Sequence, residues 1–239
     1  MKEIHEELRN AILSAIPSSN LVLFYAPLIG SGTTIPCRVS SANNGTGTNL
    51  KWKTLKSGLV VPDFDGTAYI RNATANWRSA DSQGAILVLF RCTSVTVDRT
   101  LLGSPDEATG DDYLHFSIAP TTGLLRVAQV DHGGNLNLVT GATNVGDSKW
   151  HTGALISTGT AWSILLDGVA ETLTVAQGAN NGDWFADTVN RDCIYVGANK
   201  APTLAALLIG QIGLVAVYSA APTTAEILRA SNRLKSLVP

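Results

Sequence analysis

The sequence predicts an all-β protein: one sandwich of two antiparallel sheets with a short helix at each end. Short segments rich in branched and aromatic residues recur from residue 21 to 218, separated by clusters of Gly, Asn, Asp, Ser and Thr. Several segments alternate in polarity, as in 113–119, where Leu114, Phe116 and Ile118 share one face. The length of 239 residues also suits a single sandwich, because all-β domains commonly reach ~200–250 residues.

The composition indicates a well-packed globular chain. Hydrophobic residues make up 45% of the sequence and charged residues 15%, which disfavours disorder. The formal net charge is −2, and no block of lysine and arginine suggests a nucleic-acid partner. The N-terminal segment lacks a continuous apolar stretch, so neither a signal peptide nor a membrane span is expected. Three cysteines without CxxC spacing predict no disulfide framework and no thiolate metal site, as expected for a reducing cytoplasm.

Residues 1–17 are expected to form an amphipathic helix. Ile4, Leu8, Ile12 and Ile16 recur at the spacing of one helical face, and Pro17 ends the pattern. This apolar face needs a partner surface. Two alternatives remain open: the helix packs on its own domain, or it serves for docking on another protein or for oligomerisation.

Residues 20–239 are expected to form the sandwich together with its C-terminal helix. Asp167-Gly168 predicts a two-residue hairpin turn, and Gly210 and Gly213 suit a strand that bends or bulges. The predicted strands cover residues 21–28, 67–71, 85–93, 113–119, 124–131, 152–158, 162–168, 193–197 and 212–219.

The C-terminal helix is predicted over residues 223–238. Thr223 and Glu226 have the spacing of a capping box. Ile227, Leu234 and Val238 then share one apolar face. The chain contains no linker and no convincing repeat, so a single domain is the simplest organisation.

Four stretches, in this order, resemble the laminin-G-like, concanavalin A-like lectin-glucanase family. Residues 20–52 are similar to its opening strand, and residues 146–173, with a Trp-His pair and an Asp-Gly turn, to its central hairpin. Residues 194–199 are similar to a late strand, and residues 208–234 to the closing strand and helix. The resemblance implies a jelly-roll sandwich over about residues 20–235.

The solitary domain also resembles virion proteins of tailed bacteriophages in its composition, which is poor in Met and Lys and rich in Gly, Thr, Ala and Asn. This resemblance implies a non-enzymatic structural protein of the capsid decoration type or the head or tail appendage type. Its partners would be the capsid or another virion protein and its own copies, in an oligomer such as a trimer, assembled in the host cytoplasm without secretion. The alternative is a lectin or adhesin that binds cell-surface glycans.

Enzymatic function is the least favoured class. Glycoside hydrolases of this fold need paired carboxylates on one strand, and no stretch supplies that spacing. His151 lies between Asp147 and Asp167 in the sequence, but both aspartates are predicted to be turn residues. Because Asp167 follows the next strand, we expect it to lie away from His151, and the Trp150-His151 pair is interpreted as a fold marker.

Two candidate binding sites remain. Trp77 and Trp184 stand in polar, loop-like surroundings and are the candidates for stacking on a sugar, with burial in the core as the alternative. Calcium is the one cofactor considered, since hard cations prefer oxygen ligands. Its candidate ligands form the densest acidic cluster, with a solvated loop as the alternative: Asp106, Glu107, Asp111 and Asp112.

Overall fold

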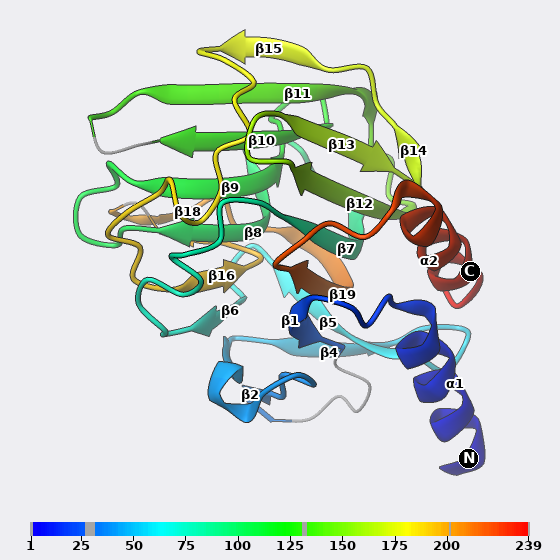
Figure 1. The fold of residues 1–239 in the computed structure, drawn as a ribbon. Helices are drawn as coiled ribbons and strands as arrows, with labels where there is room; N and C mark the ends of the chain where they lie inside the picture. Colours follow the sequence, from blue (N-terminus) through cyan, green and yellow to red (C-terminus); the bar gives the residue numbers. More distant parts are fainter. Residues whose placement is uncertain (1, 27–31, 131–132, 201, 239) are drawn as a thin grey trace.

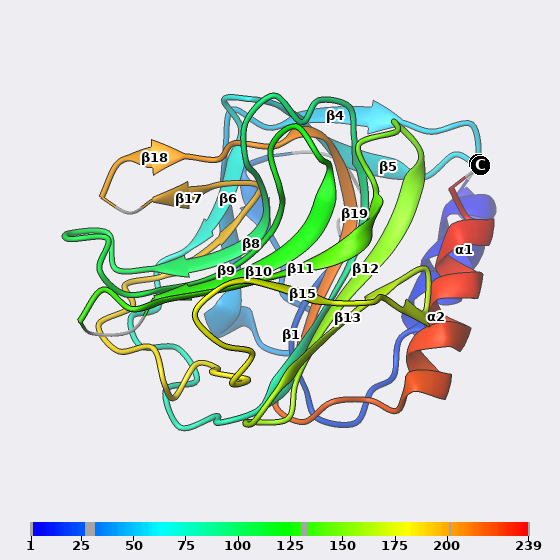
Figure 2. The same cartoon turned by 90° about the horizontal axis from the view of Figure 1, so that it is seen from above.

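The computed structural model describes residues 2–26, 32–130, 133–200 and 202–238. Two large antiparallel sheets lie face to face, and helices α1 (Lys2–Ala15) and α2 (Thr224–Ser236) pack together on the outside of one of them (Figures 1 and 2). The predicted fold class, a jelly-roll sandwich with a helix at each end, is confirmed. Within the described ranges, no helix is long and apolar enough to cross a membrane.

Sheet A is the sheet beneath the helices. Its strands follow the order β14-β13-β12-β7-β19-β5-β4, and β1 also pairs with β19. The strands of sheet A are β1 (Leu21–Tyr25), β4 (Lys51–Thr54), β5 (Val60–Asp65), β7 (Gly84–Cys92), β12 (Trp150–Ser157), β13 (Trp162–Leu166), β14 (Val169–Ala170) and β19 (Ile209–Tyr218).

Sheet B forms the opposite layer, in the order β15-β11-β10-β9-β8-β16-β6-β3-β2. A small hairpin of β17 (Asn199–Lys200) and β18 (Leu204–Ala205) stands beside it, and a 3-10 turn covers Ser41–Asn43. The strands of sheet B are β2 (Thr34–Ile35), β3 (Gly45–Thr48), β6 (Tyr69–Asn72), β8 (Arg99–Pro105), β9 (Tyr113–Ile118), β10 (Leu124–Val130), β11 (Leu136–Asn144), β15 (Thr174–Gln177) and β16 (Ile194–Val196).

The central strands of sheet A, β7 and β19, are buried on both faces. Along β7, Val88 and Phe90 belong to the core between the sheets, whereas Leu87 and Leu89 belong to the cluster beneath the helices. The strand therefore has a continuous apolar sequence, because strands covered on both sides lose the alternation of apolar and polar residues.

The helices provide the outer cover of sheet A. Ile12 and Ile16 of the N-terminal segment pack with Ile227 and Leu234 of α2 in the cluster that includes Leu214 of β19. Ile12 and Ile16 of the proposed docking face therefore pack on their own domain. This is the first of the two alternatives left open by the sequence. The side chains of Ile4 and Leu8 lie outside the described residues. Helix α2 begins at the predicted capping box, in which the Glu226 amide donates to Thr223 Oγ1 at 3.3 Å.

The predicted hairpin turn and strand bulge are both confirmed, but the hairpin is short. Asp167 and Gly168 have φ values of 52° and 82°, as a tight hairpin turn requires. Only the two residues of β14 pair with β13, however, and the chain then crosses to sheet B, where β15 pairs with β11. The register of β19 against β7 shifts between Ile212 and Leu214, which places the predicted bulge at Gly213.

The three cysteines, Cys37, Cys92 and Cys193, are free and buried. Burial raises the pKa of the Cys193 thiol to about 12. The thiols therefore behave as small apolar core groups.

Buried Arg191 holds together the loops that close one end of the sandwich. Its Nε donates to the Thr188 carbonyl at 2.7 Å and its Nη1 to Ser104 Oγ at 3.0 Å. Its Nη2 donates to the carbonyls of Trp77 and Phe185, both at 2.9 Å. Burial lowers the pKa of Arg191 to about 10, so the guanidinium stays charged at neutral pH.

We expect Arg191→Met to lower the free energy of unfolding by about 3 kcal/mol or more, because three buried carbonyls lose their donor and each costs roughly 1–3 kcal/mol. Arg191→Lys should recover little, since one ammonium lacks the forked geometry of the guanidinium. Urea denaturation measures both variants, with the exposed Arg38→Met as the control. Equal midpoints for Arg191→Met and the wild type would contradict this role.

Candidate functional site

A groove lies on the outer face of sheet B. Leu114 and Phe116 of β9 point into the core, so the alternate residues Tyr113 and His115 point outward. These two residues line a groove of about 430 Å³ over β9, β10 and β11, bounded on one side by the β17–β18 segment. Its polar lining comprises Asp98, Tyr113, His115, Arg126, Asn199 and Thr203.

Arg126 is the central charged group of this groove. Its Nε donates to Ser117 Oγ at 3.0 Å, and its Nη2 forms an ion pair with Asp98. Asp98 Oδ2 also lies 3.7 Å from His115 Nδ1. Asp98 thus fixes the orientation of the guanidinium and compensates its charge.

His115 forms the buried part of the groove. Burial lowers the pKa of His115, against the opposing effect of Asp98, so the imidazole is neutral at pH 7. Its Nε2 lies 2.9 Å from Thr100 Oγ1. The Tyr113 ring meets the imidazole edge to face, with centroids 6.3 Å apart and an interplanar angle of 81°.

Asn199 faces the groove from β17. A Cβ on Gly103 would lie only 2.8 Å from Asn199 Oδ1, so glycine at position 103 makes room for this amide. Asn199 is mostly buried, and among the described residues its Oδ1 has no hydrogen-bond partner. The groove therefore combines an aromatic ring, an ion pair and amide groups, which suits the recognition of a polar molecule.

The sequence contains one signal of this groove, the alternation in 113–119 that turns Tyr113 and His115 away from the core. Arg126 and Asp98 carry no such signal, because their proximity depends on two pairings. The pairing of β9 with β10 sets Arg126 opposite Ser117, and the pairing of β8 with β9 sets Arg99, the neighbour of Asp98, opposite Ile118. Asn199 comes from a distant part of the chain and is brought in by the β17–β18 hairpin.

The two tryptophans predicted to stack on a sugar do not lie at the surface. Trp184 has no exposed surface and Trp77 retains 6%. Both belong to the core between the sheets, where the Trp77 ring packs at 5.5 Å from that of Phe185. The structure contradicts the candidate role of Trp77 and Trp184 in stacking on a sugar, and burial in the core, the alternative, is what it shows.

The four acidic residues considered for calcium do not share a common site. Asp106 accepts from the Ala108 amide at 2.7 Å, and Glu107 pairs with Arg71 at 2.8 Å. Asp112 is buried and Asp111 is exposed. In the part of the chain that the structure describes, no three His, Cys, Asp or Glu side chains are grouped to hold a metal ion. The geometry does not favour a calcium site at Asp106, Glu107, Asp111 and Asp112.

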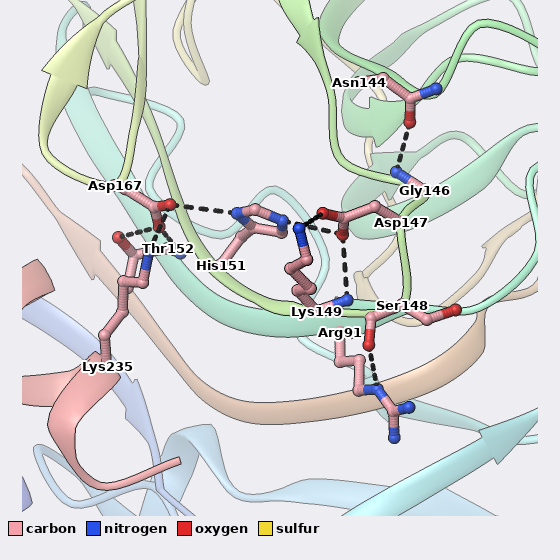
Figure 3. A network of polar contacts seen from close by, with 10 residues as sticks. All are labelled: Arg91, Asn144, Gly146, Asp147, Ser148, Lys149, His151, Thr152, Asp167 and Lys235. Carbon is pink, nitrogen blue, oxygen red and sulfur yellow. Dashed lines mark hydrogen bonds and ion pairs between the residues drawn. The ribbon is translucent and has the colours of Figure 1, made fainter. Parts of the chain in front are cut away.

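His151 lies between two carboxylates (Figure 3). Its Nδ1 is 3.1 Å from Asp167 Oδ2 and its Nε2 is 3.0 Å from Asp147 Oδ1. The expectation that Asp167 lies away from His151 is wrong, because the β12–β13 hairpin brings the turn back beside Thr152, whose amide donates to Asp167 Oδ1 at 2.9 Å. Lys235 of α2 also contacts Asp167, with Nζ 2.6 Å from Oδ2.

These contacts define a clamp between β12, the β13–β14 turn and α2. Both imidazole nitrogens face carboxylates, so neither is directed at a hydroxyl nucleophile as a catalytic triad requires. Burial alone would lower the pKa of His151, but the hydrogen bonds to Asp167 and Asp147 raise it above the ordinary value. The amide and side-chain contacts from Lys149 and His151 lower the pKa of Asp147 to about 2.

We expect the clamp to stabilise the fold in a pH-dependent way. Because folding raises the pKa of His151, its stabilising contribution is full below the unfolded-state pKa of about 6.5 and decreases as pH rises through the folded-state pKa. The melting temperature of His151→Gln should therefore lie furthest below that of the wild type near pH 5.5 and approach it near pH 9. A difference that grows with increasing pH would contradict the charged clamp.

Comparisons with known proteins show the same fold at low sequence identity. No protein-family model and no curated protein sequence matches the chain. The CBM40 of the Ruminococcus gnavus IT-sialidase, bound to α2,3-sialyllactose, has a TM-score of 0.55 at 19% identity, covering 62% of this chain and 82% of that one. Domain 4 of AbnA, a GH43 extracellular arabinanase from Geobacillus stearothermophilus in complex with arabinotriose, has a TM-score of 0.67 at 12% identity, covering 89% and 98%.

A sialidase of Trypanosoma rangeli is similar over 99% of this chain and 39% of its own, with a TM-score of 0.65 at 14% identity. These neighbours share the jelly-roll sandwich fold of this chain. At such identities the likeness concerns the fold alone.

Proposed function

We propose that the chain is a carbohydrate-binding module that holds a glycan in the groove on the outer face of sheet B. The observation that carries this proposal is the grouping of Tyr113, Arg126 and Asp98 on one open sheet face. Support also comes from similar structures that hold sialyllactose and arabinotriose. They favour the glycan-binding alternative over the virion role.

Each groove residue would make a different contact with a sugar. The Tyr113 ring offers an apolar face to the C–H groups of a pyranose or furanose, and the fixed Arg126 guanidinium donates hydrogen bonds. Within the described residues, Arg126 Nη1 has no partner, so it is the donor available to a ligand. Asp98 accepts from sugar hydroxyls with the lone pairs that Arg126 leaves unused.

We propose binding without cleavage. Among the described residues, Asp98 is the one carboxylate that lines the groove, and it is already paired with Arg126. Glycosidic cleavage needs a second carboxylate across the scissile bond. The module would therefore retain a glycan rather than hydrolyse it.

The role of a phage decoration or appendage protein is the second proposal from the sequence. It needs a free docking surface, and the two described residues of the predicted docking face, Ile12 and Ile16, are already covered by the chain itself. A defined oligomer that is lost when residues 1–17 are deleted would favour this role over the first.

The glycan proposal is tested first with sialyllactose and arabinotriose and then on a glycan array, with calcium and with EDTA. We expect Tyr113→Ala and Arg126→Gln each to weaken binding about tenfold or more, since loss of one buried contact of this kind is worth roughly 1–2 kcal/mol. Isothermal titration calorimetry gives the affinities.

The control variant is Lys51→Gln. Lys51 is exposed and forms an ion pair with Asp65 on β4 and β5 of the other sheet. This variant should bind like the wild type. Absence of binding to every glycan in both buffers would overturn the proposal, as would equal affinities for Tyr113→Ala and the wild type.

A further inference from the structure

A row of polar residues crosses sheet A where the cover of the helices ends. Trp150 of β12 pairs with Arg91 of β7, Arg91 pairs with Gln211 of β19, and Gln211 pairs with Asp63 of β5. Arg91 Nη1 donates to Gln211 Oε1 at 3.4 Å, and Gln211 donates to Asp63. One row closer to the helices, Leu89 and Leu214 belong to the buried cluster. The face of the sheet thus changes from apolar to polar at this row.

A groove of about 560 Å³ lies over this end of the sheet, between β4, β12 and the C-terminal end of α2. Its described lining includes Lys53, Lys56, Arg91, Lys149 and Lys235, five of the 17 Lys and Arg residues of the chain, and no described aspartate or glutamate. Such a concentration is unexpected in a chain with a net charge of −2. We call it the basic groove.

The clamp neutralises only part of this charge. Asp147 pairs with Lys149 at 3.2 Å and Asp167 with Lys235 at 2.6 Å, and both carboxylates also contact His151 (Figure 3). Lys53 and Lys56 are exposed and have no side-chain partner among the described residues.

Arg91 in the basic groove likewise lacks a carboxylate. Its Nε donates to the Ser148 carbonyl at 2.6 Å and its Nη1 to the Gln211 amide. Among the described residues, three positive charges therefore face the groove without a directly paired carboxylate, those of Lys53, Lys56 and Arg91.

Trp150 gives the basic groove an aromatic surface. Its indole is half-buried, packs beside the bulge at Gly213 and lines the groove together with the cations. An aromatic ring beside cations suits a ligand with both an apolar ring face and anionic groups. A sugar ring that carries a sulfate or carboxylate has both.

We infer that the basic groove binds an acidic glycan, a sugar chain carrying sulfate or carboxylate groups. Duplex DNA presents one charge per ~1.7 Å, and the negative charge of the rest of this chain opposes so dense a polyanion. The charges of an acidic glycan are more widely spaced, so a local cluster of cations is sufficient. The site lies on the side of the sandwich opposite the sheet-B groove, and its ligand is independent of the one proposed there.

The test uses the full chain with a heparin fragment and an oligogalacturonate, with neutral dextran and single-stranded oligodeoxythymidylate for comparison. We expect both acidic glycans to bind and added salt to weaken them, because exposed charges are screened. Lys53→Gln/Lys56→Gln should reduce the affinity about tenfold. Trp150→Phe should abolish the change in tryptophan fluorescence that accompanies binding.

The matched control is Arg38→Gln/Arg229→Gln, which removes two exposed positive charges from other surfaces and should bind like the wild type. The inference is overturned if neither acidic glycan binds. It is also overturned if Lys53→Gln/Lys56→Gln and the control double variant lose affinity equally. If the oligonucleotide binds more tightly than both glycans, the assignment of an acidic glycan as the ligand is wrong. Tyr113→Ala, which tests the sheet-B groove, should leave binding of the acidic glycans unchanged, so the two proposals fail separately.

Discussion

The burial of the central strands of sheet A on both faces is the constraint on which the rest of the structure depends. These strands, β7 and β19, give alternate side chains to the core between the sheets and to the cluster beneath the helices. Because such strands cannot carry polar groups at low cost, polar side chains gather where that cover is missing. Those places are the outer face of sheet B and the end row of sheet A, where the two grooves lie.

Both grooves contain charged groups that are held by neighbours of opposite charge or by hydrogen bonds. Asp98 orients Arg126 in one groove, and Asp147 and Asp167 hold His151 and two lysines beside the other. A partly buried charge is stable only when it is paired and hydrogen-bonded. In the sheet-B groove this pairing also fixes the geometry of Arg126, so a ligand there meets a preorganised donor. In the basic groove, the exposed Lys53 and Lys56 have no such partner among the described residues.

Local patterns predict the elements whose structure has a local cause. Alternation identifies β9, the Asp167-Gly168 turn follows from backbone conformation, and the capping box of α2 follows from Thr223 and Glu226. Several strands are missed, among them β3, β4, β5, β8 and β11. Strand β5 contains Pro62, and β8 is buried along its whole length without alternation. Trp77 and Trp184 mislead for a related reason: their neighbours in sequence are polar, but both indoles lie in the core between the sheets and pack on Phe185.

The position of the helices also sets how the domain can be attached to anything else. Helices α1 and α2 carry the two ends of the chain and lie together on the outer side of sheet A (Figures 1 and 2). The sheet-B groove opens in the opposite direction, on the outer face of the other layer. A fusion partner, a surface or a sensor chip joined at either end would therefore hold the domain with that groove pointing away from the support.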